Sequence, residues 1–361
     1  MDIKYLVALS TFPKFGPVRL RKLKVRFPSW QAAFFAGPDE LIRAGIDEKI
    51  ALEFIAHRKN TSPDGLMETI QKENVRLAAL DDACYPVLLK EIPDPPMLLY
   101  YRGELRDEDK FSLAVVGARK FSPYGRQVAE QFVKELVPFR IVIVSGLALG
   151  IDAIAHQAAV LAGGRTIGVL GSGVDKESIY PVANRQLSDK IIASGGCVIS
   201  EFPLGTEAMP FNFPQRNRII AGLTKGTLVI EAGEKSGALI TARFALDFNR
   251  EVFSVPGSIY SPVSAGTNEL IKQGAMPVKN GVEIIEALDL TRVSLYIKTK
   301  SIVPETKEEE RLLSFLSKEA THINELIRVS GLPTPTVTST LTIMEMKGMI
   351  KNLGGMEYIV I

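Results

Sequence analysis

Two arginines and an asparagine, Arg216, Asn217 and Arg218, are the residues of this chain best suited to hold an anion. They stand in the run FNFPQRNRIIAGL, residues 211–223, where a loop is expected to become a helix. The first turn of a helix carries unpaired backbone N–H groups and a partial positive charge, and guanidinium groups match phosphate oxygens better than ammonium groups do. The run therefore predicts a phosphate site, unless the arginines simply lie on a solvated helix surface.

Small residues follow several of the expected strands and extend this site. One glycine after a strand is ordinary turn chemistry, but here four such turns occur, and some carry a basic side chain. Small residues let an extended ligand approach the backbone closely, and the basic side chains would balance its charge. The predicted site residues in these turns are Gly117, Arg119, Ser145, Gly146, Gly150, Gly171, Ser172, Gly173, Lys235, Ser236 and Gly237.

The elements that must position these turns lie between residues 111 and 290. Helical stretches there alternate with short apolar runs at 112–117, 141–145, 166–171, 197–201, 228–231 and 252–255. Nearly continuous apolar strands separated by helices indicate a Rossmann-like, doubly wound, mostly parallel α/β sheet covered on both faces. Ligands of such sheets bind outside the carboxyl ends of the strands, which is where the glycine turns stand.

The segment before this sheet has a different character. Residues 1–62 show helical spacing and predict a small N-terminal helical domain, SAM-like or helix-hairpin-helix-like, with a hairpin-like run at 12–20. The extended Rossmann-like domain is expected to cover 63–290, and its proline-rich part, 66–105, to follow an extended path across the surface. The helical domain holds a basic run that suits either a phosphate-facing surface or a solvated helix face: Lys14, Arg19, Arg21, Lys22, Lys24 and Arg26.

The tail predicts a linker over 291–306 and a winged-helix domain over 307–361. Helices are expected at 311–317, 323–329 and 335–347, followed by a hairpin at 350–360. The last helix of such a domain usually reads duplex DNA, yet residues 334–347 hold one lysine and no arginine. We therefore expect this domain to contact protein or to tune the central site.

Composition excludes several classes of protein. The chain has 361 residues, of which 46% are hydrophobic, so it can bury large cores and is not a disordered protein. Its two cysteines, Cys84 and Cys197, suit a reducing compartment, and its first residues lack a secretory signal, which predicts a cytoplasmic location. No run reads as a membrane span. No cofactor is predicted, because the dinucleotide fingerprint and the P-loop are both missing.

Catalytic groups are sparse. Asp152 and His156 are four residues apart on an expected helix and could orient an imidazole for proton transfer or supply two metal ligands, but no third ligand is evident. A helix-stabilising contact is the alternative. Glu201 and Glu231 stand at strand ends, and we expect mainly structural roles for both.

The order of these motifs resembles that of the DNA-processing protein A (DprA, also called Smf) family of bacteria. The likeness is carried by VGAR at 116–119, SGLALGIDAIAH at 145–156, GVLGSGVD at 168–175, SEFPLG at 200–205, FPQRNRIIAG at 213–222 and SGALITA at 236–242. It implies a non-enzymatic protein that binds and protects incoming single-stranded DNA during natural transformation and loads the RecA recombinase onto it, usually as a homodimer.

By motif position, the resemblance assigns DNA binding to a basic pocket of the Rossmann-like domain. The residues it implies coincide with those of the turns: Arg119, Ser145, Gly146, 171–173, 216–218, Ser236 and Gly237. Contacts to phosphate and sugar position a strand without reading its bases. Phe211 and Phe213 stand beside the arginines and suit either base stacking or core packing.

The main alternative is an enzyme that processes nucleoside monophosphates, related to the lysine-decarboxylase-like phosphoribohydrolases. Those enzymes carry a Pro-Gly-Gly-x-Gly-Thr-x-x-Glu run, and the corresponding residues here, 231–239, read EAGEKSGAL and lack that glycine pattern. A dehydrogenase is a more distant third possibility.

Overall fold

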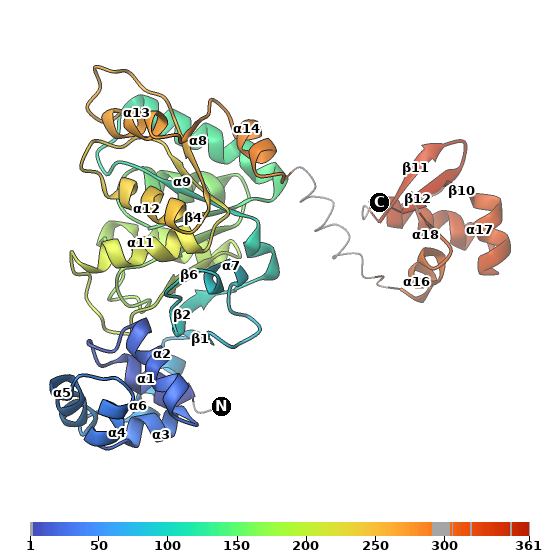
Figure 1. The fold of residues 1–361 in the computed structure, drawn as a ribbon. Helices are drawn as coiled ribbons and strands as arrows, with labels where there is room; N and C mark the ends of the chain where they lie inside the picture. Colours follow the sequence, from blue (N-terminus) through green and yellow to red (C-terminus); the bar gives the residue numbers. More distant parts are fainter. Residues whose placement is uncertain (1–2, 291–303, 305, 318–319, 347–348, 361) are drawn as a thin grey trace. The chain divides into compact units, whose positions relative to one another are not determined.

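The computed structural model describes residues 3–290, 304, 306–317, 320–346 and 349–360 (Figure 1). The chain forms two compact units, residues 1–290 and 291–361. The expected boundary at residue 62 lies within the first unit. Most of the expected linker, residues 291–303 and 305, lies outside the described residues.

The expectation of an N-terminal helical segment is confirmed. Its helices are α1 (Ile3–Ser10), α2 (Pro17–Arg26), α3 (Trp30–Phe35), α4 (Pro38–Arg43), α5 (Glu48–Arg58) and α6 (Pro63–Lys72). Proline occupies the first position of α2, α4 and α6, where its missing N–H costs no hydrogen bond. Buried leucines and phenylalanines of these helices form one core with residues of the central sheet, which is described next.

Side chains of the basic run in this segment are largely engaged with protein atoms. Lys14 pairs with Glu53, and Lys24 with Asp81 at 2.5 Å. Arg19 and Lys22 each donate to a backbone carbonyl at 2.9 Å. This run is therefore in large part a network that ties helices and loops together, and whether it also faces phosphate stays a prediction.

A nine-stranded sheet forms the centre of the first unit. Its strands are β1 (Arg76–Ala79), β2 (Leu98–Gly103), β3 (Ser112–Val116), β4 (Val142–Ser145), β5 (Thr166–Val169), β6 (Cys197–Ser200), β7 (Gly226–Val229), β8 (Glu251–Ser254) and β9 (Met276–Pro277). The order is β1-β2-β6-β5-β4-β3-β7-β8-β9, with β3 to β9 parallel. The expected doubly wound, mostly parallel sheet is confirmed.

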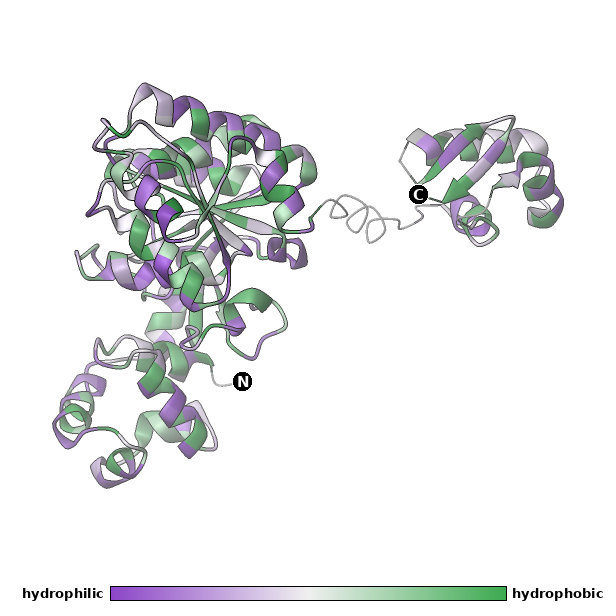
Figure 2. Ribbon diagram, turned by 45° about the horizontal axis from the view of Figure 1, so that its top comes forward, coloured by the Kyte–Doolittle hydropathy of each residue, from purple (hydrophilic) through white to green (hydrophobic). Residues whose placement is uncertain are grey.

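Helices cover both faces of this sheet. They are α7 (Val87–Lys90), α8 (Pro123–Leu136), α9 (Ile151–Leu161), α10 (Arg185–Ala193), α11 (Asn212–Gly222), α12 (Gly237–Asp247), α13 (Ala265–Lys272) and α14 (Gly281–Ala287). One group contains α8, α9, α10 and α14, and the other contains α7, α11 and α12. Figure 2 shows largely hydrophobic strands in the middle of this unit and helices of mixed hydropathy around them, as expected for parallel strands buried on both faces.

The expectation for residues 66–105 is wrong in part. This segment does not simply cross the surface, because β1 and β2 extend the sheet in antiparallel fashion next to β6. The side chains of Leu98, Leu99 and Tyr100 are buried. The prolines at 93, 95 and 96 fall in the turn before β2, and so the apolar run after them was free to form a strand.

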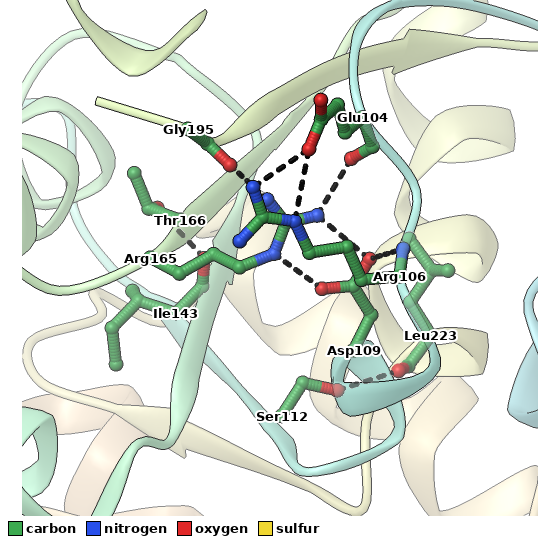
Figure 3. Close-up of polar contacts among 9 residues, drawn as sticks. All are labelled: Glu104, Arg106, Asp109, Ser112, Ile143, Arg165, Thr166, Gly195 and Leu223. Carbon is green, nitrogen blue, oxygen red and sulfur yellow. Dashed lines mark hydrogen bonds and ion pairs between the residues drawn. The ribbon is translucent and has the colours of Figure 1, made fainter. Parts of the chain in front are cut away.

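A buried ion pair holds the amino ends of the strands together (Figure 3). The Arg165 guanidinium donates to both carboxylate oxygens of Asp109, at 2.5 and 2.8 Å, and to the carbonyls of Glu104 and Gly195. Burial lowers the pKa of Arg165, but the bond and the charge of Asp109 raise it by more, so that the pKa lies above its ordinary value. This bidentate pair is far from the glycine turns, which lie at the opposite ends of the strands.

The second unit has the expected winged-helix plan. It contains α16 (Lys307–Leu313), β10 (Thr321–His322), α17 (Ile323–Ser330), α18 (Thr334–Met346), β11 (Ile350–Gly354) and β12 (Glu357–Val360), with strand order β10-β12-β11. The first helix begins earlier than expected, because Thr306 caps it by accepting from the Glu309 N–H at 3.2 Å. Across the described parts of the whole chain, no helix has the length and apolar character needed to cross a membrane.

Candidate functional site

A cavity of about 530 Å³ opens where the strand order of the sheet reverses. Strands β4 and β7 flank β3 on opposite sides, so the helices after β3 and β7 leave toward opposite faces and open a crevice between them. The loop after β3 and the loop after β7 form two of its walls, and α11 forms a third. The cavity therefore lies at the place where open α/β sheets bind ligands.

Cationic side chains dominate this cavity. Arg119 and Lys120 follow β3, Lys235 follows β7, and all three are exposed at the walls. Arg216 of α11 adds a fourth positive charge, and Asp152 is the acidic side chain that lines the cavity. An excess of positive charge in a crevice with protein walls attracts an anionic ligand.

Arg216 is held deep in the cavity wall. Its side chain is buried, and Nη1 donates to the carbonyls of Gly146 and Val169, at the ends of β4 and β5. Burial lowers its pKa to about 10, and the nearby Asp152 carboxylate opposes that change, so the guanidinium stays charged at neutral pH. Its hydrogen bonds to other described residues use Nε and Nη1.

Asn217 links Arg216 to the start of α12. Its Oδ1 accepts from Arg216 Nε at 3.2 Å, and its Nδ2 donates to the Gly237 carbonyl at 3.2 Å. The start of α12 faces the cavity, and Ser236 caps it by accepting from the Ala238 N–H at 3.3 Å. A helix N-terminus thus adds its partial positive charge to the four cations.

The expected helix start at residues 216–218 is wrong. The helix α11 begins at Asn212, so Arg216 lies beyond its first turn and cannot share the free N–H groups of the helix end. Proline at position 214 fits the first turn, and this allows the helix to start before the arginines. The helix N-terminus that faces this cavity is that of α12.

Arg218 faces a different part of the molecule. It pairs with Glu201 at the end of β6 and donates to the Asp94 carbonyl at 2.7 Å. The two paired side chains are 11% and 6% exposed, and Arg218 is not among the residues that line the cavity. Arg218 therefore joins α11 to the end of β6 and to the loop before β2.

Glycines allow the loops to pack this closely. A Cβ on Gly146 would overlap the Arg216 guanidinium, with Nη2 only 2.6 Å away. Gly150 has φ of +88°, and its Cα faces the backbone of the Arg119 loop, where a Cβ would lie 2.7 Å from the Cα of Arg119. Gly146 therefore leaves room for the Arg216 guanidinium, and Gly150 allows the close approach of the loop that carries Arg119.

The structure brings together seven of the fourteen predicted site residues in the main cavity: Gly117, Arg119, Arg216, Asn217, Lys235, Ser236 and Gly237. Gly146 and Gly171 line a smaller adjoining hollow. Ser145 and Ser172 are buried and donate to the carbonyls of Val115 and Gly173. These two serines, with Gly150, Gly173 and Arg218, line neither space.

Two aromatic residues, Phe213 and Tyr180, line the adjoining hollow, and Phe213 also lines the cavity. Phe213 is half-buried, its ring lies 5.4 Å from the Arg119 guanidinium, and its centroid is 6.0 Å from that of Tyr180. Phe211, in contrast, is 68% exposed, so core packing does not explain it. Tyr180 and Lys120 are not among the predicted site residues, although Lys120 directly follows Arg119 after a strand.

The possible catalytic residues are committed to structural contacts. Asp152 accepts from the Gly146 N–H at 3.0 Å, and burial raises its pKa. His156 bonds through Nδ1 to Thr166 Oγ1 at 2.6 Å rather than to Asp152, and burial lowers its pKa to about 3. Glu231 accepts from the Ser122 N–H at 2.9 Å and from the Ser122 hydroxyl at the start of α8.

Comparison with known proteins matches both units of the chain. The family model described as DNA recombination-mediator protein A matches residues 76–289, and that of the DprA winged helix domain matches residues 298–356. Protein Smf of Synechocystis sp. is 35% identical over 98% of each chain. DNA processing protein DprA of Streptococcus pneumoniae is 47% identical over 57% of this chain and 71% of its own.

Solved structures agree with this relationship. The X-ray structure of the Streptococcus pneumoniae protein has a TM-score of 0.68 at 35% identity and covers 78% of this chain and 97% of that one. A Helicobacter pylori DNA processing protein A, whose structure is described for its single-stranded DNA binding mode, has a TM-score of 0.53 at 30% identity. It covers 60% of this chain and 97% of its own.

Proposed function

The chain belongs to the family of DNA recombination-mediator protein A, and on this basis we propose that it binds single-stranded DNA in the cavity between the ends of β3 and β7. The observation that carries the proposal is the cavity itself, which combines three exposed cations, the buried Arg216 and the start of α12. Such a set suits the phosphates of an extended strand. Binding would be largely independent of sequence, because phosphate contacts do not read bases.

The Arg119–Phe213–Tyr180 cluster supports a flexible single strand as the ligand. Its rings stand next to the cations, where an unpaired base can stack while its phosphate contacts Arg119. Each base stacked on an aromatic ring contributes about 1–3 kcal/mol. A duplex keeps its bases stacked inside and cannot use these rings.

Titration of a labelled oligo(dT) and of a duplex of equal length against the protein, followed by fluorescence anisotropy, tests this proposal. We expect the single strand to bind more tightly, and Phe213→Ala to weaken that binding roughly tenfold at constant salt dependence. Leu161→Ala serves as the control, because Leu161 is 87% exposed at the far end of α9. Tighter binding of the duplex would contradict the proposal.

We further propose that the protein acts without catalysis, in the cytoplasm and as a homodimer, to protect incoming strands and to load RecA onto them. Asp152 accepts from the Gly146 N–H and Glu231 accepts from the Ser122 N–H, and these structural contacts support a binding role. RecA-driven strand exchange on strands coated with single-strand-binding protein should be faster with the protein present. Release of free base from a nucleoside monophosphate would instead favour the phosphoribohydrolase alternative.

The winged-helix domain is proposed to contact protein or to tune the cavity. The exposed residues of α18 include Thr338, Ser339, Thr342 and Glu345, which are neutral or acidic and give no stripe of cations for phosphate. Tight binding of duplex DNA by the isolated segment 305–361 at physiological salt would overturn this assignment.

A further inference from the structure

A second cavity, of about 460 Å³, lies on the other side of the first turn of α11. The turn before α2 forms one wall, and the loop after β6 forms another. The cavity between the ends of β3 and β7, in which we propose DNA binding, is called the DNA cavity below. Of the residues around the first turn of α11, it is lined by 213, 214, 216 and 217, whereas the second cavity is lined by 211, 212 and 215. One helix turn therefore separates the two spaces.

The lining of the second cavity differs chemically from that of the first. It contains no lysine or arginine, and its charged members are Glu201 and Glu207. Most of the remaining lining is apolar or aromatic, including Phe12, Phe15 and Met97. This environment does not suit a phosphate, but it suits a flat, largely apolar group.

An unsatisfied buried carboxylate oxygen indicates what that group must offer. The Glu201 side chain is 6% exposed, and its Oε2 pairs with Arg218. Its Oε1 has no hydrogen-bond partner among the described residues. Burial raises the pKa of Glu201, and the charge of Arg218 and the neighbouring Gln215 side chain oppose that change. A buried acceptor without a donor is costly, so an occupant with an N–H group would be favoured.

The mouth of this cavity carries an exposed ring. Phe211 is 68% exposed and Met209 is 42% exposed, and both line the cavity. Exposed aromatic side chains beside an apolar space stack unpaired bases. A helix is about 10 Å across, and a stacked strand advances about 3.4 Å per nucleotide, so a few nucleotides span the first turn of α11.

We propose that this cavity receives a nucleobase of the bound strand and prefers a base with an exocyclic amino group, which donates to Glu201 Oε1. The inference rests on the proposed binding of single-stranded DNA. Guanine and cytosine present amino donors that a glutamate accepts. In thymine the N3–H stands between two carbonyl oxygens, whose lone pairs repel the carboxylate. Phosphates stay in the cationic cavity, and selectivity comes from the acidic one.

The test compares labelled oligo(dT) with strands of equal length that carry isolated dG or isolated dC. Wild-type protein should bind the substituted strands roughly fivefold to tenfold more tightly. Equal affinities, with oligo(dT) still bound, overturn this inference and leave the proposed function intact. Absence of any single-strand binding overturns the proposed function itself.

Two variants assign the preference to this cavity. Glu201→Leu removes the acceptor and should abolish the preference, but it also leaves Arg218 without its charged partner. Gly16→Trp avoids this problem, because Gly16 lines the cavity in an ordinary extended conformation with nothing within 4 Å of an added Cβ. The indole should fill the cavity and remove the preference for dG and dC while oligo(dT) affinity changes less than twofold. A Gly16→Trp protein that keeps the preference, or loses oligo(dT) binding as well, overturns the assignment.

Discussion

Removal of Arg119 and Lys235 should flatten the salt dependence of single-strand binding. Three exposed cations line the cavity between the ends of β3 and β7, whereas Arg216 is balanced in part by Asp152. If each exposed cation neutralises one phosphate, the slope of log K against log salt is about −2, because each contact on a single strand contributes about −0.7. Affinity then falls about 18-fold between 50 and 200 mM salt.

The double variant Arg119→Ala/Lys235→Ala keeps one exposed cation in the cavity. Its slope should be about −0.7, so that affinity falls only about threefold over the same range. Anisotropy titrations of labelled oligo(dT) at four salt concentrations measure both slopes. A matched control is Arg126→Ala/Lys272→Ala, which removes one exposed arginine and one exposed lysine outside the cavity.

Equal slopes for the wild type and the cavity variant would refute the reasoning, whatever the change in absolute affinity. A loss of affinity at constant slope would mean that the substitutions disturb the fold or the stacking rather than the phosphate contacts. Arg218→Ala should not change the slope, because Arg218 lies in the ion pair with Glu201. It should instead lower the free energy of unfolding by roughly 3–5 kcal/mol, as expected when one partner of a buried ion pair is removed.

Three further outcomes are expected. Gly146→Ala should displace the Arg216 guanidinium and weaken oligo(dT) binding at least tenfold in the same anisotropy assay, since a charge-assisted contact is worth about 1.5–3 kcal/mol. Arg165→Ala should lower the free energy of unfolding in urea by roughly 3–5 kcal/mol, because it leaves Asp109 buried without its partner, and oligo(dT) affinity of the folded protein should be unchanged. The pKa of His156 is about 3 in the folded protein against an ordinary value of 6.5, so the unfolded chain binds the proton more readily. The contribution of neutral His156 to the free energy of unfolding is therefore fully present above pH 6.5 and decreases as the pH falls toward 3, by about 2 kcal/mol at pH 5. Urea titrations of His156→Gln should show a smaller loss of stability between neutral pH and pH 5.

The sheet was predictable because its signals are local. Each parallel strand is a short apolar run, and the strand ends carry turn residues whose meaning does not depend on distant parts of the chain. The two antiparallel strands, β1 and β2, were harder to predict from the sequence. Residues 98–103 become a strand because they pair with β6, about 95 residues later in the chain, and no local pattern announces such a partner.

The site was predictable as a location but not as a set of contacts. Arg119 and Lys235 follow strands and are exposed, as their positions indicate. Ser145 and Ser172 also follow this pattern, yet both are buried and bond to backbone carbonyls. The side chain of a residue at a strand end can point into the crevice or back into the sheet. Its direction depends on tertiary packing, which cannot be read from the local sequence.

The run at 211–218 shows how a helix distributes neighbouring residues among different tasks. Successive residues of a helix are rotated by about 100°, so Arg216 and Arg218 cannot face the same space. Arg216 lines the cavity between the ends of β3 and β7, Arg218 reaches Glu201, and Gln215 lines the second cavity. The two arginines, which the sequence suggests bind one phosphate together, therefore have separate roles. Arg216 places its charge at the cavity, and Arg218 holds Glu201, the carboxylate whose second oxygen we propose as the acceptor for a base. This division predicts that Arg216→Lys and Arg218→Lys differ in kind. Both should lower stability, because lysine cannot hold together the two acceptors that each guanidinium joins. The first should also reduce oligo(dT) affinity, and the second should weaken the preference for dG.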